Sequence, residues 1–178
     1  MTNLERRLPY VLVIGAVLAL DQIAKWLVVR SLELHDYRPL VDGVLSLSHV
    51  RNRGAAFGIL SDADLPYQAM LFSALSLVAL LAIAVYAWRL PASARLPQSA
   101  LALILGGAFG NLIDRVRLGY VVDFVHVYWK DYQWPDFNVA DSAITIGVTL
   151  LVLDILRTPH VAAGKADLEV VSPAGRTE

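Results

Sequence analysis

The sequence predicts an all-α membrane protein with four transmembrane helices, a small β-rich platform on one side of the membrane and an interfacial segment. Of its 178 residues, 57% are hydrophobic and 17% are charged, and the mean hydropathy is +0.55. Soluble domains carry about 25% charged residues. Four segments also approach the ~20 largely apolar residues that a helix needs to cross a bilayer. These observations indicate an integral membrane protein.

The four predicted helices cover about residues 9–29, 65–88, 96–113 and 139–156. The first is cleanly apolar only as far as Leu20, a length typical of a signal-peptide core. No small-x-small cleavage site follows, and the apolar residues 26–29 extend the segment, so we expect a membrane-spanning helix.

An even number of helices places residues 30–64 and 114–138 on one side of the membrane, and both termini with residues 89–95 on the other. Each side carries seven Lys and Arg, so the positive-inside rule does not orient the chain as a whole. The short 89–95 loop, with two Arg and no acid, favours cytoplasmic termini. Residues 158–178 mix charge, Pro and Gly without periodicity, which predicts a disordered tail.

Two stretches outside the helices have their own character. Residues 40–60 combine Val, Leu and Phe with three glycines in a strand-and-turn pattern, which predicts a small sheet on the membrane surface. Residues 121–129 (VVDFVHVYW) are apolar and aromatic but too short to span, which favours an interfacial or re-entrant element.

Asp123 and Asp141 flank the entry to the last helix and are the candidate catalytic pair. A carboxylate near hydrocarbon costs about 2.5–3.5 kcal/mol at a helix centre, so it usually faces a partner, a wet cavity or a substrate. Eighteen residues and Pro135 separate the two, so any meeting is tertiary. If they meet, they share a proton, which leaves one general base and one general acid for peptide hydrolysis. In the alternative interpretation, Asp141 caps the fourth helix and Asp123 faces water.

Other polar and small residues have structural interpretations. Asp21 and Lys25, four residues apart, share a helix face and favour a structural ion pair or interfacial snorkelling. Gly106 and Gly110 have the small-xxx-small spacing that allows close helix packing.

Rival chemistries remain open. A metal site could use Asp123 and His126, completed by His49 or Asp141, although no HExxH spacing occurs. Ser–Lys catalysis would draw on residues without an evident pairing in the sequence: Ser46, Ser48 and Ser142 with Lys25 or Lys130.

Some classes of protein are excluded or disfavoured. The net charge of −1, with no basic run, argues against a nucleic-acid partner, and the lack of cysteine excludes disulfides and thiolate nucleophiles. A transporter would need both aspartates on a through-path, and a scaffold would need neither.

Five motifs occur in a fixed order: DQIAK (21–25), VRNRGAAFG (50–58), GGAFGNLIDR (106–115), GYVVDF (119–124) and WPDFNVADSAI (134–144). Together they closely resemble the bacterial lipoprotein signal peptidase family, also called signal peptidase II, over roughly residues 9–157.

The resemblance implies a four-helix inner-membrane aspartic endopeptidase that cleaves prolipoproteins just before a diacylglyceryl-modified cysteine, with no cofactor or metal. It implies cytoplasmic termini and an active site near the outer leaflet. Its partners would be these precursors and membrane lipids, and the lack of a soluble domain favours a monomer. The matching motifs imply catalytic Asp123 and Asp141 and a structural Asp21–Lys25 pair, together with substrate-binding or dyad-supporting residues: Asn52, Asn111, Arg115 and Asn138.

Overall fold

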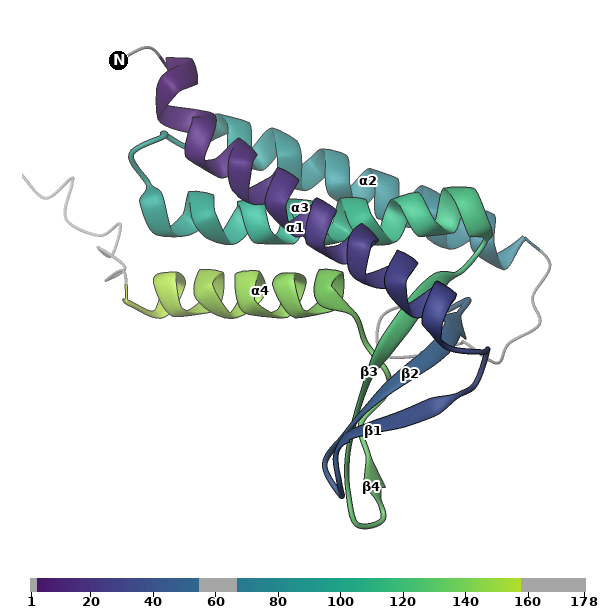
Figure 1. The fold of residues 1–178 in the computed structure, drawn as a ribbon. Helices are drawn as coiled ribbons and strands as arrows, with labels where there is room; N and C mark the ends of the chain where they lie inside the picture. The colour runs from purple at the N-terminus through teal and green to yellow at the C-terminus, as the bar shows by residue number, and fades with distance from the viewer. Residues whose placement is uncertain (1–2, 55–66, 158–178) are drawn as a thin grey trace, which may run out of the picture.

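A computed structural model describes residues 3–54 and 67–157 and shows a bundle of four helices with a sheet at one end (Figure 1). The helices are α1 (Asn3–Ser31), α2 (Gln68–Arg89), α3 (Arg95–Leu118) and α4 (Val139–Arg157). Each is long and apolar enough to cross a membrane, which confirms the four predicted spans. The expected disorder of residues 158–178 and the part of the platform beyond residue 54 lie outside the described residues.

Helix α3 is the centre of the bundle and packs against the other three helices. Glycines allow the close approach, because a Cβ on Gly106 would lie 2.8 Å from the Val17 Cβ of α1. On its α4 side, α3 packs its Ile104 against Gly147, where a Cβ would lie 2.7 Å from the Ile104 Cγ1. Small residues at helix interfaces are typical of membrane bundles. The packing role predicted for Gly106 therefore agrees with its surroundings.

The sheet contains four antiparallel strands in the order β1-β2-β3-β4. They are β1 (Tyr37–Val41), β2 (Leu45–Asn52), β3 (Val121–Trp129) and β4 (Tyr132–Gln133). The predicted small sheet is confirmed, with one difference: residues 121–129, expected as a separate interfacial element, form one of its two inner strands, β3. This strand is buried over most of its length, so its sequence reads as an apolar run instead of an alternation.

Strand β3 is joined tightly to the bundle. Helix α3 is followed by its C-cap Gly119, whose φ of 78° is a left-handed conformation that glycine adopts without strain. The Gly119 N–H donates to the Arg115 carbonyl at 3.0 Å. Phe124 of β3 then packs against Val28 and Leu32 at the end of α1. These contacts hold the neighbouring Asp123 at the junction of sheet and helices.

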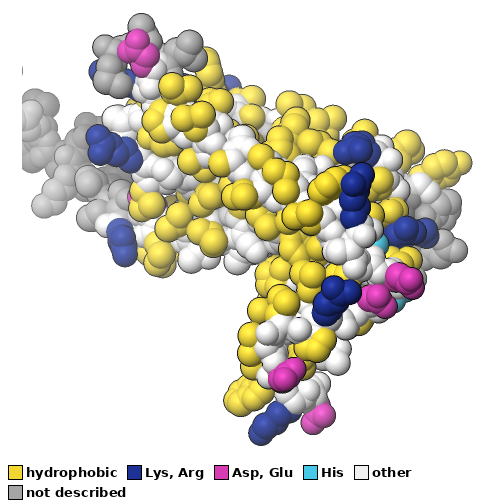
Figure 2. All heavy atoms as spheres, in the orientation of Figure 1, with side chains coloured by type: hydrophobic (Ala, Val, Ile, Leu, Met, Phe, Trp, Pro, Cys, Tyr) yellow, Lys and Arg dark blue, Asp and Glu magenta, His cyan; other side chains and the backbone are white. Residues whose placement is uncertain are grey.

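Hydrophobic side chains cover the visible side of the bundle, and charged side chains gather toward its ends and on the sheet (Figure 2). Both ends of the described chain lie at the end of the bundle opposite the sheet, as an even number of spans requires (Figure 1). Trp129, Tyr132 and Trp134 are exposed on the sheet and its connection to α4. Such aromatic side chains favour the headgroup region of a membrane.

Candidate active site

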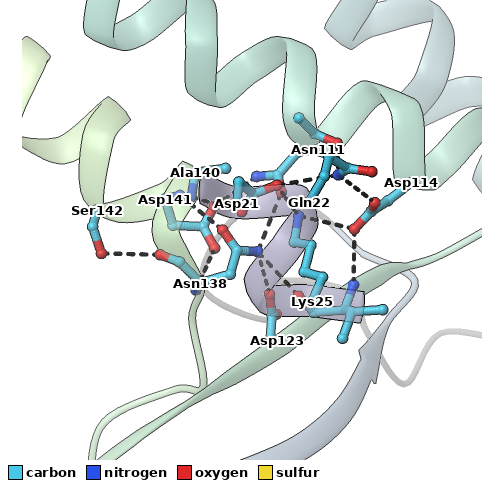
Figure 3. Close-up of polar contacts among 12 residues, drawn as sticks. Asp21, Gln22, Lys25, Asn111, Asp114, Asp123, Asn138, Ala140, Asp141 and Ser142 are labelled. Carbon is cyan, nitrogen blue, oxygen red and sulfur yellow. Dashed lines mark hydrogen bonds and ion pairs between the residues drawn. The ribbon is translucent and has the colours of Figure 1, made fainter. Parts of the chain in front are cut away.

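Buried polar side chains converge where the sheet meets the helices, and Figure 3 shows those of α1, α3, β3 and the start of α4. Burying polar and charged groups is costly unless they are paired and hydrogen-bonded, so a buried polar cluster in a membrane protein indicates a structural or functional role. Those that are at most 7% exposed are Asp21 and Lys25 of α1, Asn52 of β2, Asn111 and Asp114 of α3, Asp123 of β3, and Asn138 before α4.

Asn138 connects the two candidate carboxyls. Its side-chain amide donates to Asp123 Oδ1 at 2.7 Å, and its Oδ1 accepts the backbone N–H of Asp141 at 2.9 Å. The Asn138 backbone N–H in turn donates to Asp141 Oδ2 at 3.2 Å. The structure therefore brings Asp123 and Asp141 to the same asparagine, although they lie on different elements.

The contacts of Asp141 with Asn138 are also a helix cap. Asn138 is the N-cap of α4 and Asp141 is three residues later, so the two residues satisfy each other's backbone N–H groups reciprocally, as in a capping box. The alternative that Asp141 is a cap is thus correct as a description of its contacts. The alternative that Asp123 faces water is wrong, because this residue is only 1% exposed.

Two further asparagines hold the carboxyls. Asn52 donates to Asp123 Oδ2 at 3.0 Å, and Asn111 donates to Asp141 Oδ1 at 2.8 Å. Asn111 also receives a hydrogen bond on its own Oδ1 from Lys25 at 2.9 Å, which fixes the orientation of its amide. Amide donors on both aspartates fix the carboxyl geometry, and a single lysine lies behind Asn111.

Asp123 combines burial with a neighbouring carboxylate. Burial and the charge of Asp141 raise the pKa of Asp123 from 3.8 to about 7, against the opposing effects of the hydrogen bonds from Asn52 and Asn138 and of the Lys25 charge. An acid with this pKa keeps its proton in neutral solution about as often as it loses it. A titrating carboxyl of this kind is suited to proton transfer.

Lys25 bridges two carboxylates in the polar cluster behind the candidate carboxyls. Its Nζ lies 2.8 Å from both Asp21 Oδ2 and Asp114 Oδ2, and it is 4% exposed. The sequence correctly predicted the Asp21–Lys25 contact, while the burial of Lys25 excludes interfacial snorkelling. Asp21 also accepts the Ala140 N–H at 3.0 Å, which ties α1 to the first turn of α4.

Sequence reasoning missed Gln22 and the role of Asp114. Gln22 donates to Asp114 Oδ1 at 3.0 Å and to the Gly110 carbonyl at 3.3 Å, and Asp114 accepts the Val122 N–H at 3.2 Å. The available signal was a glutamine beside Asp21 within an apolar helix. Gly110 lies against this cluster, because a Cβ there would be 2.7 Å from Asp21 Oδ2.

Two cavities meet at Asp141. One, of about 210 Å³, lies among α2, α3, α4 and the sheet, and its polar lining is Asn52, Asn111, Arg115, Asp141 and Ser76. The other, of about 460 Å³, is mainly apolar and is lined by Trp134, Phe137, Asp141, Ser142, Thr145 and Ile146. Asp123 is one hydrogen bond from the wall of the first cavity, through Asn52.

Arg115 is at the edge of the same cavity. Its Nη2 donates to the Gly54 carbonyl at 3.0 Å, while its Nε is buried without a hydrogen-bond partner among the described residues. A planar guanidinium with a spare donor can bind a carbonyl or a phosphate oxygen.

The rival chemistries are not assembled in the described part of the chain. Asp123 and His126 are three residues apart on β3 and so point to opposite faces of the sheet, and no group of three or more potential metal ligands occurs among the described residues. Ser48 donates to Asp136, and Ser142 donates to the Asn138 carbonyl. Among the described residues, the polar partners of Lys25 are the carboxylates of Asp21 and Asp114 and the amide oxygen of Asn111. No Ser–Lys pair forms from these residues.

The fold and this site define a multi-pass membrane protein with a pair of amide-bound carboxyls at one end of its bundle. Residues 13–157 match the family described as Signal peptidase (SPase) II. The chain belongs to the signal peptidase II family.

Curated relatives agree over most of their length. A lipoprotein signal peptidase of Geobacter sulfurreducens is 53% identical over 140 residues, which is 79% of this chain and 86% of the relative. One of Geobacter metallireducens is 51% identical over 146 residues, which is 82% of this chain and 89% of the relative.

Two solved structures, both described as bacterial membrane enzymes determined by the in meso method, have the same fold. One, at 2.3 Å resolution, is 33% identical with a TM-score of 0.74 and covers 91% of this chain and 94% of its own. The other, at 1.9 Å resolution, is 30% identical with a TM-score of 0.75 and covers 85% of this chain and 94% of its own.

Proposed function

We propose that this signal peptidase is an aspartic endopeptidase of the bacterial inner membrane that removes signal peptides from prolipoproteins, with Asp123 and Asp141 as its catalytic pair. The observation that carries the proposal is the bridge of Asn138 between the two carboxyls, at the wall of a cavity. The names of the relatives supply the precursor as substrate.

The two carboxyls have different roles in the proposed reaction. Asp141 borders the cavity and acts as general base: it takes a proton from water, whose oxygen attacks the scissile carbonyl carbon. Asp123, with a pKa of about 7, is the general acid that donates its proton to the carbonyl oxygen. When the tetrahedral intermediate collapses, the C–N bond breaks and the proton held by Asp141 passes to the leaving amine. One hydroxyl of the intermediate returns its proton to Asp123 as the C=O bond of the new carboxyl group forms, which restores both carboxyls.

The surrounding residues orient the substrate and the pair. Asn52, Asn111 and Asn138 hold the carboxylate oxygens in place, so their donors need no reorganisation during the reaction. Arg115 donates its free Nε–H to a substrate carbonyl. Asp21, Lys25, Gly106 and Gly110 are structural: the ion pair and the close helix contacts keep α1, α3 and α4 in place.

The proposed cleavage is just before a diacylglyceryl-modified cysteine. The mainly apolar cavity on the far side of Asp141 has room for a lipid chain beside the scissile bond. A lipid anchor holds this bond at headgroup depth, which matches a site at the end of the bundle, near the outer leaflet. In this arrangement both termini are cytoplasmic, and the chain acts as a monomer among membrane lipids.

The experiment is cleavage of a purified diacylglyceryl-modified prolipoprotein, compared with the same precursor lacking the lipid, in the presence and absence of a chelator. The proposal predicts chelator-resistant cleavage of the lipid-modified precursor alone, with the new amino terminus at the modified cysteine. Loss of cleavage on chelation would instead indicate a metallopeptidase. A folded wild-type protein without any cleavage would favour a transporter or a scaffold.

A further inference from the structure

The segment from Trp134 to Asn138 connects the sheet to α4 and delivers Asn138 to the two carboxyls. Backbone hydrogen bonds attach it to β3: Trp134 N–H donates to the Val127 carbonyl at 2.8 Å, and Phe137 N–H donates to the Val125 carbonyl at 3.1 Å. The position of Asn138 therefore depends on the register of this segment along β3.

Asp136 is the side chain that fixes this register. Ser48 Oγ of β2 donates a hydrogen bond to Asp136 Oδ1, and His126 Nδ1 of β3 lies 3.4 Å from the same oxygen. Ser48 is fully buried. The His126 ring is held in turn by Tyr37, edge-on with centroids 5.0 Å apart, and by Tyr128, stacked at 5.4 Å. One carboxylate thus accepts a hydrogen bond from β2 and lies beside the His126 ring of β3, whose Nδ1 has no hydrogen-bond partner among the described residues.

A bulge in β2 separates these contacts from the catalytic pair. The pairing of β2 with β3 shifts by one residue between Leu47 and Val50. Because a one-residue shift moves the following side chains to the other face, Ser48 lies on the face of His126 while Asn52 lies on the face of Asp123. A single strand therefore supplies a partner to Asp136 on one face and a partner to a catalytic carboxyl on the other.

We infer that Asp136 is a positioning residue: through its hydrogen bond from Ser48, and packed beside His126, it holds the 134–138 segment in register, so that Asn138 reaches both Asp123 and Asp141. The inference rests on the proposed function. Asp136 itself borders neither of the two cavities at Asp141, so it acts through Asn138 and does not touch the substrate.

The inference has a signature in the pH dependence of cleavage. The hydrogen bond from Asn138 lowers the pKa of Asp123 and so opposes the effects of burial and of the Asp141 charge. The positive charges facing Asp123 are those of Lys25 and Arg115. A displaced Asn138 withdraws its donor, so the pKa of Asp123 rises and the alkaline limb of the pH–rate profile moves to higher pH.

The test compares Asp136→Ala, Ser48→Ala and the double variant, with the diacylglyceryl-modified prolipoprotein as substrate. We expect kcat to fall about 10- to 100-fold in each single variant, since misplacing a catalytic group by about 1 Å can cost about 10²-fold. The double variant should be no slower than the slower single variant, because both changes break the same contact. The alkaline limb should shift upward in all three.

The matched control is Asp131→Ala, which removes an exposed carboxylate from the turn between β3 and β4. It should leave kcat and the pH profile unchanged. Ser48→Ala keeps both Asp136 and His126, so a shifted limb in this variant does not come from the removal of either group. Ser48→Ala also tests the positioning role of Asp136 if Asp136→Ala does not fold.

Either of two results would overturn the inference: a wild-type kcat in Asp136→Ala and Ser48→Ala, or a reduced kcat with an unmoved alkaline limb, which indicates a structural role alone. The Asp123→Asn variant separates this failure from that of the proposed function. If the wild type cleaves, Asp123→Asn does not, and Asp136→Ala is normal, only the positioning role is wrong. If Asp123→Asn cleaves at the wild-type rate, the proposed function fails.

Discussion

Asp123→Asn should change the pH dependence of stability in a way that can be calculated from the structure. The pKa of Asp123 is raised from 3.8 to about 7, mainly by burial. Each unit is about 1.36 kcal/mol, so the folded protein loses about 4 kcal/mol at alkaline pH relative to strongly acidic pH. The folded state holds its proton more tightly than the unfolded state, so the loss begins near the unfolded pKa and levels off above about pH 7.

Between about pH 5 and about pH 8 the wild type should therefore lose about 2–3 kcal/mol of unfolding free energy relative to Asp123→Asn. The amide also turns one acceptor into a donor that faces Asn52 or Asn138, which costs about 1–3 kcal/mol, but at every pH. The pH dependence of the difference, and not its absolute value, is the diagnostic quantity.

The assay is chemical unfolding in mixed micelles at both pH values, with Asp131→Asn as the exposed control. The control should follow the wild type at both values. A difference between wild type and Asp123→Asn that does not change with pH would refute the reasoning, because it would mean that Asp123 has an ordinary pKa in the folded protein.

Two other substitutions test the polar cluster and the helix packing by the same unfolding assay. Lys25→Met should lower the free energy of unfolding by about 3–5 kcal/mol, because it leaves two buried carboxylates without their cation. Lys130→Met, on the sheet, should change this free energy little. Equal effects of the two substitutions would contradict the structural role of Lys25. Gly110→Ala should destabilise the protein, because its Cβ would lie 2.7 Å from Asp21 Oδ2. Gly15→Ala should not, because a Cβ at Gly15 would have nothing within 4 Å. A tolerated Gly110→Ala would show that α1 and α3 can separate at no cost.

The helices were predictable because their signal is local. Length and composition locate a span without knowledge of its neighbours, which is why all four were found. The helix ends were less accurate: α3 runs to Leu118, past the apolar stretch, because its polar residues Asn111, Asp114 and Arg115 face the buried cluster and continue the helix. The end of this helix is instead determined by Gly119.

The site was only partly predictable, because its geometry is tertiary. The Asp21–Lys25 contact follows from a four-residue spacing on one helix. By contrast, Asp123 meets Asn138 only because β3 and the 134–138 segment pair side by side, and Ser48 meets Asp136 only through the packing of β2 against β3. No periodicity in the sequence indicates the bulge in β2 that separates these two sets of contacts.

The central claim is that Asp123 and Asp141 together perform the hydrolysis. The most direct measurement is the single-turnover rate at which purified Asp123→Asn and Asp141→Asn cleave the diacylglyceryl-modified prolipoprotein in the presence of chelator, with folding of each variant verified. The account predicts that each variant loses about 10²–10⁴-fold of the wild-type rate, the usual contribution of general acid–base catalysis. A folded variant of either aspartate that cleaves at close to the wild-type rate would contradict it.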